Sequence, residues 1–362
     1  MGNNTSITEH KRHYYRELLC IGVPIIIGQL GTIILGFADT LMIGHHSTEE
    51  LAAAGLVNNI ITFILVSYMG FSYGLTPIIG KLYGMEKTDK IGQKVKNSFF
   101  ANMVVGVIFS LALIILYFNL HRIGQPEELL ALIRPYFIVN LISVLFVGVF
   151  NTLKQFLDGI GNTKVAMWVM IMGNIVNIFG NWVLIYGVGP CPEMGLLGAG
   201  ISTLASRVLM AVAMVGIIAG TKEYREYRNN IIASRINGAD FREMNRLGWP
   251  VALQLALESG AFTLSCVMVG WLGTIPLAAH QVMITISQLF YLVLSGMAAA
   301  LAIRVSHFVG QNDFAAVRRN AYDGWRLNLL FSLCMGIPVL LLRHQIGGWF
   351  NDNVEVQQYV AL

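Results

Sequence analysis

Two acidic side chains inside long apolar stretches are the residues most able to do chemistry in this sequence. Asp39 lies in the stretch 18–44, and Glu258 lies in the stretch 249–272. A charged carboxylate in hydrocarbon costs about 2.5 to 3.5 kcal/mol on insertion scales, so such acids usually face a partner or a water-filled path. We interpret both as cation-coupling residues that exchange a proton or hold Na⁺ beside other oxygen ligands. The alternatives are an interfacial carboxylate for Asp39 and a structural hydrogen bond for Glu258.

Amide side chains offer further oxygens. Asn174, Asn177 and Asn181 recur at spacings of three and four, which places them on one face of a helix. They could form a polar pocket with Asp39, or they could hold neighbouring helices together by hydrogen bonds. Gln281 and Gln288, seven residues apart, could play a similar part for Glu258, with a weaker signal.

The elements that position these side chains are membrane-spanning helices. The chain has 362 residues, 55% hydrophobic and only 12% charged, against roughly 25% charged in soluble domains. We therefore predict an all-α, polytopic membrane protein. Nine stretches are long and apolar enough to span a bilayer: 18–44, 51–80, 98–118, 131–153, 166–186, 198–219, 249–272, 277–303 and 327–342.

Basic residues alternate along the chain in a way that predicts its orientation. Lys and Arg gather before the first stretch and after the second, fourth, sixth and eighth stretches, whereas the other connections hold almost none. By the positive-inside rule the N-terminus is cytoplasmic. We expect the protein to lie in the inner or plasma membrane of the cell.

An internal repeat divides the chain. A shift of 226 residues brings Gly22 and Pro24 onto Gly248 and Pro250, and further glycines also coincide. The shift passes over six helices, so both copies enter the membrane in the same direction, as parallel repeats. We predict a six-helix lobe over 1–225 and the first three helices of a second lobe over 226–362.

A proline lies early in the first helix of each copy. Pro24 and Pro250 each remove one backbone hydrogen bond, which favours a kink. The alternative is a tolerated curvature of the helix.

Several classes of function have no residues to support them. The net charge of +4 comes from short loops and not from a basic stripe, which excludes nucleic acid as an expected partner. Four cysteines lie far apart, with no metal-binding spacing, and no hydrolase or ATPase motif is present. We expect neither enzyme activity nor a cofactor. Arg207, inside the sixth stretch, must pair with an acid or reach the membrane surface.

Over essentially its whole length the sequence resembles the multidrug and toxic compound extrusion (MATE) transporters. The resemblance rests on the GxP that opens each copy and on strings in the family's order: FADTLMIGHHSTEELAAAGL, GLTPIIGKLYGMEK, FLDGIGNTK, NIVNIFGNWVLIYGVG, MGLLGAGIST, PLAAHQVMITI and SHFVGQND. It implies twelve helices in two six-helix lobes around a V-shaped cleft, and export of cationic or amphipathic compounds in exchange for H⁺ or Na⁺.

The same resemblance implies roles for single residues. Asp39 matches the first-helix acid, Asn177 and Asn181 the fifth-helix polar pair, Thr203 the sixth-helix hydroxyl and Glu258 the seventh-helix acid. An amide at Asn181 together with the seventh-helix acid is similar to the NorM-type branch. Helices ten to twelve of that pattern are absent from this sequence.

From residues and resemblance together we expect a monomeric, H⁺- or Na⁺-coupled antiporter that exports drugs or organic cations by alternating access. The two lobes would rock about a central cleft, with Asp39 and Glu258 holding the coupling ion. The alternatives are a flippase for lipid-linked oligosaccharides from the same superfamily, and a truncated remnant that does not transport.

Overall fold

The fold consists of helices throughout the described part of the chain, residues 2–123, 126–350 and 354–361 of a computed structural model. The α-helices are α1 (Gly2–His46), α2 (Thr48–Tyr73), α3 (Leu75–Gly84), α4 (Thr88–Phe118), α5 (Glu127–Gly159), α6 (Thr163–Ile185), α7 (Gly195–Gly220), α8 (Arg225–Ala233), α9 (Gly238–Gly270), α10 (Thr274–Gly310), α11 (Phe314–Phe350) and α12 (Val354–Ala361). Two 3₁₀ turns, η1 (Leu120–Ile123) and η2 (Lys222–Tyr224), lie in connections. The all-α prediction is confirmed.

Nine stretches of the described helices are long and apolar enough to cross a membrane, as the sequence predicts. The helices are longer than their apolar parts, because hydropathy marks where lipid begins and backbone hydrogen bonding continues beyond it. For example, α4 begins at Thr88, ten residues before the predicted start at 98. The second predicted span is two helices, α2 and α3, which meet at Gly74.

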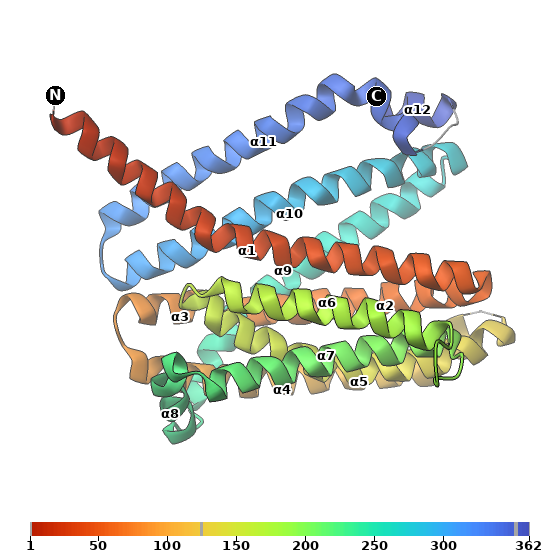
Figure 1. Cartoon of the computed structure of the whole chain (residues 1–362), viewed down its shortest axis with the longest axis horizontal. Coiled ribbons are helices and arrows are strands. Elements are labelled where there is room, and N and C mark those ends of the chain that lie inside the picture. The colour runs from red at the N-terminus through yellow and green to blue at the C-terminus, as the bar shows by residue number, and fades with distance from the viewer. Residues whose placement is uncertain (1, 124–125, 351–353, 362) are drawn as a thin grey trace.

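The long helices run roughly along one direction, with α1 and α10 between the α2–α7 bundle and α11 (Figure 1). Helix α1 packs on α6 of the first copy and on α10 of the second, while α9 packs on α2. The first and second copies of the repeat therefore meet through α1 with α10 and through α9 with α2.

These contacts obey the 226-residue shift. A Cβ on Gly22 would lie 2.7 Å from Sδ of Met297, and a Cβ on Gly248 would lie 2.7 Å from Cδ2 of Phe71. Gly22 and Gly248 are repeat partners, and so are Phe71 and Met297, because 22 + 226 = 248 and 71 + 226 = 297. The two copies thus pack across an approximate twofold axis, although the division at 225 and 226 itself stays a prediction.

The copies close against each other at one membrane edge, the edge that carries the basic connections. Gly84 of α3 lies against Gly310 of α10, where a Cβ on Gly310 would be 2.9 Å from the Gly84 Cα. Lys94 of α4 pairs with Asp240 of α9 over 2.6 Å at the same edge. Arg304 of α10 likewise forms an ion pair with α1.

Both prolines lie inside continuous helices, Pro24 in α1 and Pro250 in α9. Helix α1 changes direction along its course (Figure 1). Close to its proline, the Thr163 hydroxyl at the start of α6 donates to the carbonyl oxygen of Ile21 over 3.0 Å. A side chain from α6 thus supplies a donor to the α1 backbone in the turn that precedes the proline.

Candidate functional site

The carboxylate of Asp39 lies against α6, on the face that the asparagines form. Nδ2 of Asn181 donates to Oδ1 of Asp39 over 2.5 Å. With the Asn177 amide oriented so that both its ends are satisfied, its Nδ2 donates to the same oxygen over 2.9 Å. Both asparagines are fully buried. The structure therefore joins Asp39 with Asn177 and Asn181, which is one of the two arrangements that the sequence leaves open.

Helix α7 holds Asn177 through further hydrogen bonds. The side-chain oxygen of Asn177 accepts from the hydroxyl and from the backbone N–H of Thr203, each at 3.2 Å. The hydroxyl of Ser202 donates to the Asn177 backbone carbonyl over 2.8 Å. Because α6 and α7 are fixed to each other here, the Asn177 amide is held in one orientation toward the acid.

Arg207 follows Thr203 by one turn of α7 and brings a positive charge near Asp39. Its Nη1 donates to the Ser143 hydroxyl of α5 over 2.5 Å. Asp39 is the acid whose charge acts on it. Of the two expectations for Arg207, the structure favours the nearby acid: the side chain bonds into the bundle and lies near Asp39, although within the described residues the two do not form a direct ion pair.

Asn174 lies one turn from Asn177 but has a different neighbour. A Cβ on Gly31 of α1 would lie 2.7 Å from Nδ2 of Asn174. Asn174 therefore packs closely on the α1 backbone and lies beside the site.

The second acid has separate surroundings. Glu258 of α9 interacts with the Tyr291 hydroxyl of α10 through its side chain. Nε2 of Gln281 lies 3.1 Å from Sγ of Cys266, so among the described contacts Gln281 is paired with that cysteine instead of with Glu258. Gln288 is exposed on α10. The structure thus places Glu258 beside Tyr291. Tyr291 was not among the predicted site residues, although it is a polar residue inside an apolar stretch.

A polar cluster around His46, which we call the His46 cluster, lies at the end of α1 opposite the basic edge. It consists of His46, Glu50, Glu193 and Tyr186. Nδ1 of His46 is 2.8 Å from Oε2 of Glu50 in α2, and its Nε2 is 2.9 Å from Oε1 of Glu193 in the α6–α7 loop. The ring also packs edge-on against Tyr186. His46 therefore connects three segments, and the sequence offered no signal for this cluster because it depends on the path of the loop.

The Asp39 carboxylate supplies the oxygen atoms at this site that could bind a proton or a small cation, because both amides turn their Nδ2 groups toward it. Oδ1 of Asn181 is buried and has no partner among the described residues, so it is free to act as a further ligand. Groups of three or more His, Cys, Asp or Glu that could hold a metal do not occur in 2–123, 126–350 or 354–361.

The family model MatE matches residues 24–183 and 250–361. Its two segments begin 226 residues apart, since 250 − 24 = 226, which is the shift of the internal repeat.

Solved structures with the same fold include a MOP superfamily transporter from Pyrococcus furiosus, whose binding pocket is described as having reversed polarity. It is 20% identical in sequence, and the match covers 96% of this chain and 76% of the transporter's chain, with a TM-score of 0.80. The eukaryotic MATE transporter AtDTX14 is 18% identical, with 96% and 77% covered and a TM-score of 0.83. An outward-facing multidrug resistance MATE transporter is 19% identical, with 95% and 76% covered and a TM-score of 0.83.

Proposed function

We propose, from the premise that this chain belongs to the MATE family of membrane transporters, that it is a cation-coupled antiporter which exports amphipathic or cationic small molecules. The observation that supports this proposal most directly is the buried carboxylate of Asp39, held by two amide donors of α6. A membrane-embedded acid with such partners is the type of group that transporters use to bind a coupling ion.

The coupling ion binds at Asp39 and competes with the substrate. When H⁺ or Na⁺ binds the carboxylate, the hydrogen bonds that the two amides donate to it become weaker, because the negative charge is neutralised. Asn181 can then turn its free side-chain oxygen toward Na⁺. Glu258 with Tyr291 forms a second cation site, in the second repeat, at a position that the repeat does not align with Asp39. Release of the ion restores the negative charge that attracts a cationic substrate.

Alternating access is supported by where the repeats touch. Contacts such as Gly84 with Gly310 and the Lys94–Asp240 ion pair lie at one membrane edge. Opening these contacts while the opposite ends close would expose the site to the other side. Because Lys and Arg gather at this edge, we place it, with the N-terminus, in the cytoplasm, and we place a monomeric protein in the inner or plasma membrane.

The test is neutralisation of each acid. Asp39→Asn and, separately, Glu258→Gln should abolish or strongly reduce dye efflux from cells that express the protein, whereas Asp89→Asn, at an exposed position of α4, should not. Unchanged efflux in both acid variants would refute the proposal. Imposing H⁺ and Na⁺ gradients in turn then identifies the ion.

A flippase for lipid-linked oligosaccharides is the second candidate, and Arg207 is the observation that favours it. Its guanidinium, inside the membrane span, could bind a phosphate of the carrier. The two candidates are separated by the transported molecule: reconstituted protein would translocate a pyrophosphate-linked lipid under the second candidate and a cationic dye under the first, and under the second candidate Arg207→Gln would reduce flipping.

A further inference from the structure

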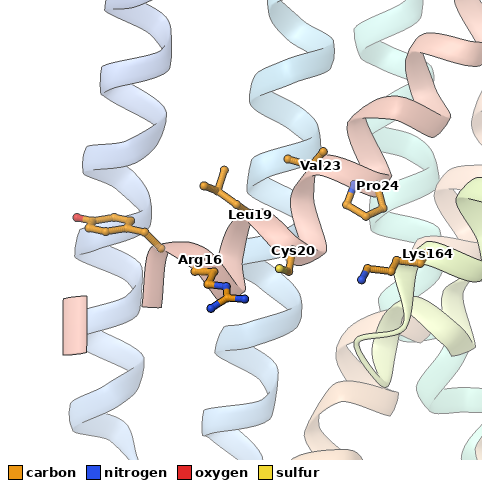
Figure 2. Close-up of a pocket in the computed structure, with 7 residues that line it drawn as sticks. Arg16, Leu19, Cys20, Val23, Pro24 and Lys164 are labelled. Carbon is orange, nitrogen blue, oxygen red and sulfur yellow. The ribbon is translucent and has the colours of Figure 1, made fainter. Parts of the chain in front are cut away.

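A crevice lies beside the first half of α1, away from the Asp39 site. It has a volume of about 660 Å³, and its mostly apolar lining includes Arg16, Leu19, Cys20, Val23 and Pro24 of α1 and Lys164 of α6. Figure 2 shows the Lys164 side chain reaching from the start of α6 toward α1, with Cys20 between it and Arg16 in that view. The crevice thus has walls from two different helices.

The crevice carries two positive charges and no negative one. Arg16 and Lys164 are both exposed. In the described part of the chain neither side chain forms an ion pair with an acid, and no acidic residue lines the crevice. Two free cations at the edge of a membrane span attract an anionic group.

The remainder of the lining is suited to an apolar chain. Leu19 and Val23 follow Arg16 by about one and two turns, which is roughly 5 and 10 Å further into the span at about 1.5 Å per residue. From Val23 an exposed apolar stripe continues along α1 through Ile27, Ile34 and Leu41. A charged end at the membrane edge and an apolar track leading inward match the shape of an amphiphile.

We propose that this crevice binds an anionic phospholipid, with the phosphate between Arg16 and Lys164 and an acyl chain along the exposed stripe of α1. A free phosphate would use the two cations but would leave the apolar stripe uncovered. A zwitterionic lipid would fill the stripe but would bring its own positive charge to the two cations.

The position of the crevice gives the bound lipid a structural effect. Arg16 precedes Pro24 in α1, while Lys164 follows Thr163, whose hydroxyl bonds to the Ile21 carbonyl. A phosphate that contacts both cations therefore joins the first segment of α1 to α6 across the turn that contains the proline. The lipid stabilises one direction of α1, the helix that also carries Asp39.

Lipid binding is measured by native mass spectrometry on the purified protein, titrated with dioleoylphosphatidylglycerol or dioleoylphosphatidylcholine. A basic side chain near an anionic headgroup contributes roughly fivefold in affinity, so the first phosphatidylglycerol should bind about 25-fold more tightly than the first phosphatidylcholine. Arg16→Gln/Lys164→Gln should remove this preference, and Arg16→Lys/Lys164→Arg should retain it. Lys87→Gln/Lys90→Gln removes two exposed charges at the same edge, outside the crevice, and should also retain it.

Three results would overturn the proposal. One is an unchanged preference in the Arg16→Gln/Lys164→Gln variant, and another is an equal loss in Lys87→Gln/Lys90→Gln, which would indicate attraction by general surface charge. The third is displacement of the lipid by an equal concentration of glycerol 3-phosphate, which would assign the site to a free phosphate ester. If the double variant does not fold, each single variant must lose roughly fivefold.

Discussion

Asn181→Leu tests the Asp39 site at its shortest hydrogen bond. The substitution keeps the approximate size of the side chain and removes both the Nδ2 donor, 2.5 Å from Asp39, and the buried Oδ1 that has no partner in the described residues. It leaves the Asn177 donor in place at 2.9 Å. The carboxylate therefore loses one of its two amide donors.

The size of the effect follows from the loss of that one bond. A hydrogen bond to a charged group contributes about 1.5 to 3 kcal/mol, and about 1.4 kcal/mol corresponds to a tenfold change in an equilibrium constant. The charged form of Asp39 is weakened by this amount relative to the protonated form. For a proton-coupled transporter the pH of half-maximal efflux should rise by about one to two units. For a sodium-coupled one, loss of the Asn181 oxygen should raise the half-maximal Na⁺ concentration by about tenfold or more.

The assay is dye transport in proteoliposomes of purified protein, with internal and external pH and Na⁺ set independently. Asn174→Leu is the matched control, because it makes the same substitution on the same helix at a residue that packs on Gly31. Its pH and Na⁺ profiles should stay close to those of the unchanged protein. Identical profiles for Asn181→Leu and Asn174→Leu would refute the role of Asn181.

Three further substitutions test contacts elsewhere. Gly84→Leu would place Cβ 2.0 Å from a carbonyl oxygen of α10. We therefore expect the free energy of unfolding to fall by about 1 to 3 kcal/mol in a thermal unfolding measurement, and efflux to be reduced. Gly55→Leu is the control and should show neither effect, because no atom lies within 4 Å of a Cβ at that position. Thr163→Val removes the donor to Ile21 and should cost about 0.5 to 1.5 kcal/mol in the same unfolding measurement; an unchanged melting temperature would contradict this. His46→Ala removes the bond between α1 and Glu193 of the α6–α7 loop. Limited proteolysis should therefore cut residues 186–194 faster than in the unchanged protein, and an equal rate would show that the histidine does not hold the loop.

Polar residues in apolar stretches allowed much of the first-repeat site to be predicted. Asp39, Asn177 and Asn181 stand out because burial of a polar group without a partner is costly, and helical spacing places the two asparagines on one face. Thr203 was identified only through the family resemblance. The structure places all four together, while their role in transport stays a proposal.

Other contacts depend on features that hydropathy does not contain. The partner of Gln281 depends on how α10 is rotated about its own axis relative to α9. Both helices carry several polar residues, so the sequence alone does not decide which of them Gln281 contacts. The His46 cluster requires the α6–α7 loop to bring Glu193 back, which it does through backbone with positive φ at Gly187 and Gly189. The helices extend beyond the predicted apolar spans because caps such as Ser47, and not the edge of the apolar run, set where a helix begins.

The reciprocal contacts between the repeats have an evolutionary consequence. Gly22 with Met297 and Gly248 with Phe71 follow the rule of an isologous interface, in which residue i meets j and the partner's j meets i. A homodimer of one ancestral half would form this same interface. We infer that duplication and fusion kept the dimer's geometry in a single polypeptide and freed each half to diverge. Asp39, whose counterpart is Ser265, and Glu258, whose counterpart is Thr32, are products of that divergence.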